Sequence, residues 1–296
     1  MAGPRVLVVG DLLYDMLAKA EGEISLGTDT FVPIRVSAGG SGANAAAWLV
    51  HSGIETRFVG RVGDDVFGRF LEGEMERSGV GSHLARDPSL ATGKVFVLVD
   101  GAGERTMITD RGAGEALGPC DLSPTLFAGG HLHLSGYTLS GGSRRETAKE
   151  ALRHARGARM TVSVDPSSVP LLRSVGPERF LEWTRGADLL FPNLTEGETL
   201  TGETDPGRIL EKLLPYYSSV VLKLGPEGAL YADRGGEPLR VPAAAVRVED
   251  TTGAGDAFSA GFLAAWLAGE APAEALRRGA GIAGEAVGRV GARPAV

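Results

Sequence analysis

The residues best suited to chemistry form one run near the C-terminus, Asp250-Thr251-Thr252-Gly253-Ala254-Gly255-Asp256, which leads directly into a long apolar helical pattern. Backbone N–H groups at the start of a helix bind anions, and Gly253, Ala254 and Gly255 have little side chain to obstruct a phosphate. The helix dipole favours a carboxylate in the first turn, and Asp256 could take the proton of an attacking hydroxyl. The run therefore predicts phosphoryl transfer to an alcohol, although an N-capped helix after a glycine turn fits the spacing equally well.

A second glycine-rich run, Gly39-Gly40-Ser41-Gly42-Ala43-Asn44, also opens a predicted helix. Bare backbone here would let a polyhydroxy ligand approach closely, and Asn44 offers it both a donor and an acceptor. The run also fits the relaxed dinucleotide-binding fingerprint, with Asp64 about 20 residues further on. However, Pro33 interrupts the segment before it, and the strand expected to open such a unit, residues 6–9, lacks the motif. We therefore favour the polyhydroxy ligand over NAD.

Acidic residues follow the first and a later predicted strand. Asp11 comes directly after residues 6–10, and Asp15 lies four residues on. An ionised carboxylate accepts hydrogen bonds from two sugar hydroxyls, so both are candidate ligand-binding residues, with a capping or turn role as the alternative. Asp165, which precedes Pro166 at the end of another strand, is interpreted as a turn residue.

These residues must be positioned by an alternation of short β-branched runs and helical patterns. The predicted strands are residues 6–9, 56–59, 132–135, 161–164, 189–191 and 220–224, and the predicted helices are 44–52, 66–78, 143–157, 178–185, 196–201 and 206–214. Such alternation predicts an α/β fold with a mainly parallel sheet covered by helices on both faces. Ligands then bind beyond the carboxyl ends of the strands.

Two segments, about 12–37 and 91–109, break this rhythm because they lack long helical patterns. Residues 94–100 and 105–109 resemble a hairpin around Gly101-Ala102-Gly103. We predict that both segments form a small separate sheet rather than an antiparallel edge of the main one. No internal repeat or linker interrupts the chain, so residues 1–296 are predicted to form one domain.

The composition excludes several classes of protein. The 296 residues carry 30 Lys and Arg against 37 Asp and Glu, a net charge of −7, which argues against nucleic acid or an anionic membrane as the partner. The single Cys rules out a disulfide framework, and no apolar run is long enough for a signal or membrane segment, so we expect a cytoplasmic protein. Gly93-Lys94 is followed by Val95, so there is no P-loop.

Together and in this order, the motifs resemble the ribokinase-like (phosphofructokinase-B) family of carbohydrate kinases, over residues 5–294. The signature regions are 38–65 and 250–260. Asn193-Leu194-Thr195-Glu196 and Lys223-Leu224-Gly225-Pro226-Glu227-Gly228 match two lesser family motifs.

The resemblance implies a Rossmann-like core with a β lid, and ATP- and Mg²⁺-dependent phosphorylation of a sugar hydroxyl. Asp256 would be the catalytic base, beside an anion hole formed by Gly253, Ala254 and Gly255. The implied substrate-binding residues are Asp11, Asp15, Gly39, Gly40, Asn44 and Arg105, and the implied nucleotide-binding residues are Asn193, Lys223, Gly225 and Gly228. Glu196, with Asn193, would organise Mg²⁺ through water, and Asp250, Thr252 and Gly291 would form a loop for a monovalent cation such as K⁺.

The acceptor remains open between ribose, fructose and a 2-keto-3-deoxy sugar acid. Ser41 and Leu13 stand where ribokinases proper usually carry Lys and Asn, and Arg105 either faces an acidic sugar or is a solvated lid charge. A nucleoside or vitamin kinase of the same fold is one alternative, but few aromatic residues lie near the lid. A non-catalytic sugar-binding regulator is another, although a sensor needs no anion hole with a base. A lid sheet with an apolar face also predicts a homodimer.

Overall fold

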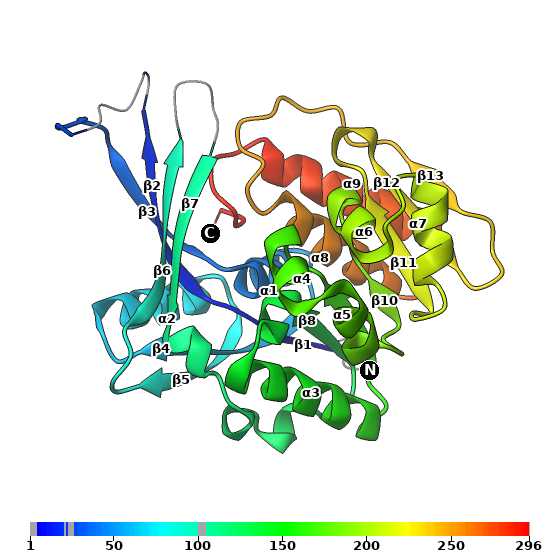
Figure 1. Cartoon of the computed structure of the whole chain (residues 1–296), viewed down its shortest axis with the longest axis horizontal. Helices are drawn as coiled ribbons and strands as arrows, with labels where there is room; N and C mark the ends of the chain where they lie inside the picture. The colour runs from blue at the N-terminus through cyan, green and yellow to red at the C-terminus, as the bar shows by residue number, and fades with distance from the viewer. Residues whose placement is uncertain (1–4, 21, 23–26, 100–104, 296) are drawn as a thin grey trace.

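The computed structural model describes residues 5–20, 22, 27–99 and 105–295, and its strands lie in two separate sheets (Figure 1). The strands of the large sheet are β1 (Arg5–Val9), β4 (Glu55–Gly63), β5 (Gly81–Asp87), β8 (His131–Ser135), β9 (Thr161–Asp165), β10 (Leu189–Leu190), β11 (Ser219–Lys223), β12 (Ala229–Asp233) and β13 (Leu239–Val241). Within the described residues their order is β13-β12-β11-β10-β9-β8-β1-β4-β5. The pairs from β11 to β5 are parallel, and β12 and β13 add an antiparallel edge.

Helices cover both faces of this sheet (Figure 1). They are α1 (Ser41–His51), α2 (Val66–Arg77), α3 (Gly142–Gly157), α4 (Val169–Val175), α5 (Pro177–Thr184), α6 (Leu194–Thr201), α7 (Pro206–Leu213), α8 (Ala254–Leu267) and α9 (Pro272–Val287). Because strand side chains alternate, Leu7 and Val9 pack with α3–α7, whereas Val6 and Val8 pack with α1, α2, α8 and α9. The predicted α/β class is confirmed.

Several elements differ from the sequence prediction. α1 begins at Ser41 rather than at Asn44, because Gly40 adopts a φ of 94° that only glycine takes readily and so ends the preceding strand. Strand β5 has mostly exposed or half-buried side chains and β13 has three residues, so neither shows a clear apolar period. Helix α4 has seven residues and one buried face, so it is too short to show an apolar period in the sequence.

The segments that broke the rhythm form the second sheet, which we call the lid. It contains β2 (Leu13–Lys19), β3 (Ile34–Gly39), β6 (Thr92–Val99) and β7 (Arg105–Gly112), in the order β3-β2-β6-β7 (Figure 1). Strands β6 and β7 pair antiparallel, as the predicted hairpin requires, whereas its turn at 101–103 lies outside the described residues. The expectation of a separate sheet is therefore correct, and one lid face buries Leu13, Val95, Val97 and Val99.

The C-terminal segment after α9 returns to the junction between the lid and the large sheet (Figure 1). There the indole Nε1 of Trp48 donates to the Ala292 carbonyl at 2.9 Å.

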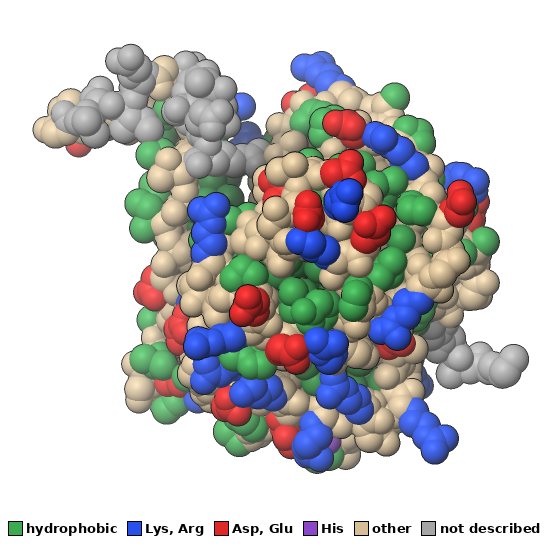
Figure 2. All heavy atoms as spheres, turned by 45° about the vertical axis from the view of Figure 1, so that its right-hand side comes forward, with side chains coloured by type: hydrophobic (Ala, Val, Ile, Leu, Met, Phe, Trp, Pro, Cys, Tyr) green, Lys and Arg blue, Asp and Glu red, His purple; other side chains and the backbone are tan. Residues whose placement is uncertain are grey.

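The face drawn in Figure 2 shows acidic and basic side chains interspersed rather than segregated. None of the helices in the described part of the chain has the length and hydrophobicity needed to cross a bilayer.

Candidate active site

A cavity of about 440 Å³ lies between the lid and the carboxyl ends of the parallel strands. Both glycine-rich runs line it, although about 210 residues separate them in the sequence, because α1 and α8 begin at the same end of the sheet. Its lining is Asp11, Leu13, Asp15, Gly40, Ser41, Asn44, Val95, Val97, Met107, Thr109, Arg111, Tyr137, Asp165, Ser167, Asn193, Glu196, Lys223, Thr251, Thr252, Gly253, Gly255 and Asp256.

Asp256 lies where the two runs meet. Ser41 Oγ donates to its Oδ1 at 2.8 Å, and Asn44 Nδ2 donates to its Oδ2 at 3.2 Å. Burial, reinforced by the negative charge of Asp165, raises the pKa of Asp256 to about 7, while these hydrogen bonds and Lys223 oppose the rise. A carboxylate with a pKa near neutrality is well matched to taking and returning a proton. Ser41 was not among the predicted site residues.

The backbone before Asp256 turns at Gly253 into the N-terminus of α8. Gly253 caps α8 with a φ of 75°, and a Cβ there would lie 2.5 Å from the Ala292 carbonyl oxygen, so only glycine fits. Ala254 was predicted to contribute to the anion hole, but its N–H is directed at the Thr251 carbonyl at 3.3 Å. The first turn of a helix has no intrahelical acceptors for its N–H groups, so those of Gly255 and Asp256 are the donors available to a ligand.

Cationic and acidic side chains meet beside this helix end. Lys223 Nζ would lie 3.3 Å from a Cβ at Gly255, and it donates to Asp165 Oδ2 at 2.7 Å. Asp165 Oδ1 accepts from the Ser167 N–H at 2.9 Å, so the predicted turn exists. The turn interpretation was nevertheless incomplete, because the other oxygen forms a buried ion pair that needs β9 and β11 to lie in one sheet.

Glu196 lies at the start of α6, where it forms a capping box with Asn193. The Asn193 N–H donates to Glu196 Oε2 at 2.9 Å, and the Glu196 N–H donates to Asn193 Oδ1 at 2.9 Å. Burial and the nearby Asp165 raise the pKa of Glu196 to about 7, against the effect of Lys223. The Asn-x-x-Glu motif thus places one buried carboxylate at the cavity wall.

Two carboxylates mark the lid end of the cavity. Asp15, on β2, has an Oδ1 that is buried without a hydrogen-bond partner, and burial raises its pKa to about 7. A Cβ at Gly39 would overlap this carboxylate, which explains the glycine. Asp11 Oδ1 accepts from the Gly42 N–H at 3.2 Å and from Ser135 Oγ at 3.3 Å. The lid end of the cavity therefore holds a buried carboxylate oxygen whose hydrogen-bonding capacity is unused.

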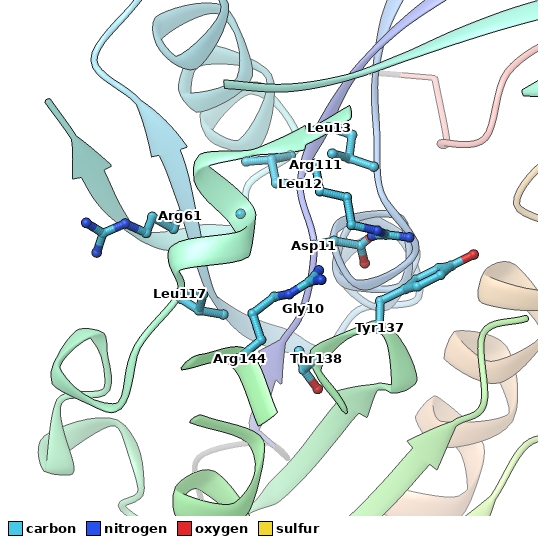
Figure 3. Close-up of a pocket in the computed structure, with 11 residues that line it drawn as sticks. Gly10, Asp11, Leu12, Leu13, Arg61, Arg111, Leu117, Tyr137, Thr138 and Arg144 are labelled. Atoms are coloured by element: carbon cyan, nitrogen blue, oxygen red, sulfur yellow. The ribbon is translucent and has the colours of Figure 1, made fainter. Parts of the chain in front are cut away.

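A small second cavity of about 10 Å³ adjoins this end, and Figure 3 shows its lining. The guanidinium groups of Arg111 and Arg144 point toward Asp11, whereas Arg61 points away. Arg111 stacks on the Tyr137 ring, 4.0 Å from its centroid, and its Nη1 lies 3.5 Å from Asp11 Oδ2. That Nη1 is buried without a hydrogen-bond partner. Arg111 also lines the large cavity, although no local feature of the sequence marks it as a site residue.

Four of the other predicted residues, Gly225, Gly228, Asp250 and Gly291, do not line the cavity, whereas Thr252 does. Gly228 has a φ of 94° and passes close to the Val241 carbonyl, so it serves the turn between β11 and β12, and Gly225 also lies in that turn. Only the backbone of Arg105 falls within the described residues, and Arg111, also on β7, lines the cavity. Asp250 accepts from the N–H groups of Thr252 at 2.8 Å and Gly291 at 3.0 Å, so the predicted loop exists.

The fold and cavity define an α/β protein in which a lid sheet faces a carboxylate beside a helix N-terminus. A model of the family described as "pfkB family carbohydrate kinase" matches residues 4–296. The ATP-dependent ribose-1-phosphate kinase of Halopiger xanaduensis is 32% identical, covering 98% of this chain and 94% of that protein. The 2-dehydro-3-deoxygluconokinase of Thermoproteus tenax is 30% identical, covering 90% and 86%. A solved structure of adenosine kinase from Sinorhizobium meliloti aligns with a TM-score of 0.90 at 27% identity, covering 100% of this chain and 97% of that one.

The chain therefore belongs to the pfkB family of carbohydrate kinases. It is a sugar kinase, a phosphotransferase with an alcohol group as acceptor. The family resemblance and the class of enzyme expected from the sequence are thus confirmed.

Proposed function

We propose that this kinase transfers the γ-phosphate of ATP to a hydroxyl of a small sugar derivative, with Asp256 as the general base. One observation carries the proposal. Asp256 lies within hydrogen-bonding distance of Ser41 and Asn44 from the glycine-rich run of α1, at the N-terminus of α8. Base, anion-binding backbone and acceptor-binding residues therefore share one cavity.

In this mechanism the acceptor hydroxyl lies between Asp256 and the bare helix end. Asp256 takes the hydroxyl proton as the new P–O bond forms, and the bond between the γ-phosphorus and the β,γ-bridging oxygen breaks to release ADP. The N–H groups of Gly255 and Asp256 stabilise charge on the transferred group, and Lys223 adds a positive charge beside them. Lid side chains Val95 and Val97 exclude water, which would otherwise compete as the acceptor.

The residues at the other end of the cavity fit a nucleotide-bound Mg²⁺. Mg²⁺ keeps most of its waters and needs only one or two protein carboxylates beside the phosphates. Glu196 supplies a buried carboxylate in the cavity wall, and Asn193 holds it in place. The ion would neutralise charge on the phosphates. A monovalent cation at the loop of Asp250, Thr252 and Gly291 is part of the proposal, and K⁺-dependent turnover tests it.

Arg111 favours an acceptor that carries a carboxylate or phosphate group. Arg111 lines the cavity. Its guanidinium is held against Tyr137 and has a buried Nη1 that only approaches Asp11 at 3.5 Å. The positive charge of this guanidinium would stabilise an anionic group on an acceptor bound in the cavity. The names of the two relatives agree, since one is named for a phosphorylated ribose and the other for a gluconate derivative.

The adenosine kinase neighbour raises a nucleoside as the alternative acceptor. A purine needs a flat aromatic face, and among the described residues the cavity offers one ring, Tyr137, which Arg111 already covers. The other aromatic side chains near the lid do not line the cavity: Tyr14 packs on Phe67 and Phe70, and Phe31 is 93% exposed. These contacts support a sugar derivative.

A panel of acceptors tests the proposal directly. ADP release would be measured with ribose, fructose, ribose 1-phosphate, a 2-keto-3-deoxy sugar acid and adenosine, each against an ATP-only control. We expect the phosphorylated or acidic sugars to give the highest kcat/KM. Turnover of adenosine alone would instead support the nucleoside kinase, and sugar binding without ADP release would indicate a regulator.

We also propose that the kinase forms a cytoplasmic homodimer through the outer face of the lid. Strand register aligns four apolar side chains there, from Val36 through Met16 and Phe96 to Ile108. Val36 is 49% exposed and Ile108 is 65% exposed, and exposed apolar side chains gathered on one sheet face are typical of an association surface.

A further inference from the structure

Residues 291–293, which follow α9, pack against the elements that form the active site. The Gly291 N–H donates to Asp250 Oδ2 at 3.0 Å, and the Ala292 carbonyl accepts from Trp48 Nε1 at 2.9 Å. The same Ala292 carbonyl fills the space that a side chain at Gly253 would need. The segment therefore touches both the loop before α8 and the body of α1, which are the two elements that form the site.

Arg293 extends from this segment into the site wall. Its Nε donates to Asn44 Oδ1 at 3.1 Å, and its Nη2 donates to the Gly39 carbonyl at 3.1 Å. Its Nη1 lies 3.6 Å from the sulfur of Met75 on α2. One planar guanidinium thus joins the end of β3, the first turns of α1 and the side of α2, and its fixed fork can hold two acceptors at once.

The contact decides which way the Asn44 amide faces. A guanidinium has only donors, so the carbonyl oxygen of the amide must point toward Arg293. The amide NH₂ then points the other way, where it donates to Asp256 Oδ2 at 3.2 Å. With the amide reversed, NH₂ would face the guanidinium and the carbonyl oxygen would face the Asp256 carboxylate, and both contacts would be repulsive.

The charge of Arg293 also acts on Asp15. It favours the ionised form of that carboxylate and so lowers the pKa of Asp15, against the larger effect of burial and the like charge of Asp11. Burial lowers the pKa of Arg293 itself to about 10, so the guanidinium stays charged at neutral pH. One side chain therefore supports both the amide that contacts Asp256 and the carboxylate expected to bind the acceptor.

We propose that Arg293 is a positioning residue for phosphoryl transfer, which orients the Asn44 amide toward Asp256 and so couples the C-terminal segment to the acceptor site. The inference rests on the proposed function of Asp256 and Asn44. It assigns Arg293 no contact with the reacting atoms. It also predicts that the segment containing Arg293, which lies 249 residues beyond Asn44 in the sequence, is needed for turnover.

A spectroscopic test is available because the chain contains two Asn residues, Asn44 and Asn193, and no Gln. A ¹⁵N-labelled sample therefore has two side-chain NH₂ pairs, and Asn193→Asp identifies the Asn44 pair by removing the other. In Arg293→Met we expect the Asn44 pair to shift and exchange faster with solvent while the Asn193 pair stays in place. Arg289→Met is the matched control, since Arg289 pairs with Glu285 outside the cavity.

Kinetics supply the second readout. We expect Arg293→Met to lose on the order of 10²-fold in kcat/KM for the acceptor, the effect of displacing a catalytic contact by about 1 Å, with the KM for ATP nearly unchanged. Arg293→Lys keeps the charge but not the fork, so it should recover only part of the loss, and it decides the matter if the Met variant fails to fold.

An unmoved Asn44 pair in both variants, or kcat/KM within twofold of the wild type, would overturn the inference. The proposed function fails separately, if the wild-type protein releases no ADP with any acceptor. In that case the NMR comparison still decides whether Arg293 orients Asn44.

Discussion

Replacing Asp256 by Asn separates catalysis from stability, because the two should change in opposite directions. The amide cannot take the hydroxyl proton, so turnover should fall by about 10²–10⁴-fold if Asp256 is a general base. Acceptor and ATP should still bind, since Asp11, Asp15 and Lys223 remain. Wild-type turnover should in turn decline as the pH falls below about 7, because burial raises the pKa of Asp256 to about 7.

The stability change follows from that same pKa. The pKa of Asp256 is raised in the folded state above its unfolded value of ~3.9. Such a group stabilises the fold fully at pH values below the unfolded pKa, and this stabilisation is lost as the pH rises through the folded pKa. A pKa of about 7 then corresponds to a cost of about 4 kcal/mol above pH 7, at ~1.36 kcal/mol per pH unit. Asp256 is partly open to the cavity, which reduces this cost, and Asn forfeits one hydrogen bond from Ser41 or Asn44, worth about 1 kcal/mol.

The expected net result is a variant more stable than the wild type by about 1–3 kcal/mol at pH 8. The two proteins should unfold alike at pH 4. Chemical denaturation at both pH values measures the free energy of unfolding, and ADP release measures turnover. Near-normal turnover would end the assignment of the base. Equal free energies of unfolding for the two proteins at pH 8 would show that burial of the ionised Asp256 carboxylate does not destabilise the fold.

Three further predictions concern the acceptor and the assembly. In Arg111→Met, kcat/KM for a phosphorylated or acidic sugar should fall about 10–100-fold, the size expected for losing an interaction with a charged group. The kcat/KM for a neutral sugar should change little. An equal loss for both sugars would refute the anion contact. In Gly39→Ala the new Cβ displaces the Asp15 carboxylate, so the acceptor KM should rise about 10-fold in steady-state assays, whereas the control Gly73→Ala, whose Cβ meets no neighbour, should leave it unchanged. Ile108→Asp should convert the dimer to a monomer in light scattering, whereas the control Val66→Asp, at an exposed position on α2, should leave the dimer intact. A wild-type monomer at micromolar concentration would refute the lid interface.

The large sheet could be predicted because each of its central strands carries its own local signal. Buried parallel strands appear as short apolar runs, and residues 6–9 and 220–224 were recognised in this way. The exposed strand β5 escaped prediction because half-exposed side chains show no apolar period. The lid was found by the opposite signal, a loss of helical pattern, but its parallel pairing of β2 with β6 depends on contacts between distant segments.

The candidate site divides in the same way. The Gly253–Asp256 run and the Asn193–Glu196 capping box are local motifs, so neighbouring residues are enough to specify their backbone. Arg111 left no comparable signal, because one charged residue at the end of a strand is usually a solvated one. It became a site residue only when Asp11, from the loop after β1, and Tyr137, from the short turn after β8, packed beside it.

The sequence by itself therefore determined the chemistry of this kinase: a glycine-rich helix start with a carboxylate, a second bare turn, and the family to which they belong. Tertiary structure alone decided how the carboxylate is held. Ser41 and Asn44 reach Asp256 across more than 200 residues, and Arg293 contacts Asn44 from 249 residues away. Hydrogen bonds act over about 3 Å, so a chain cannot signal such partners locally, and only the packing of α1, α8 and the chain end against one sheet edge brings them together.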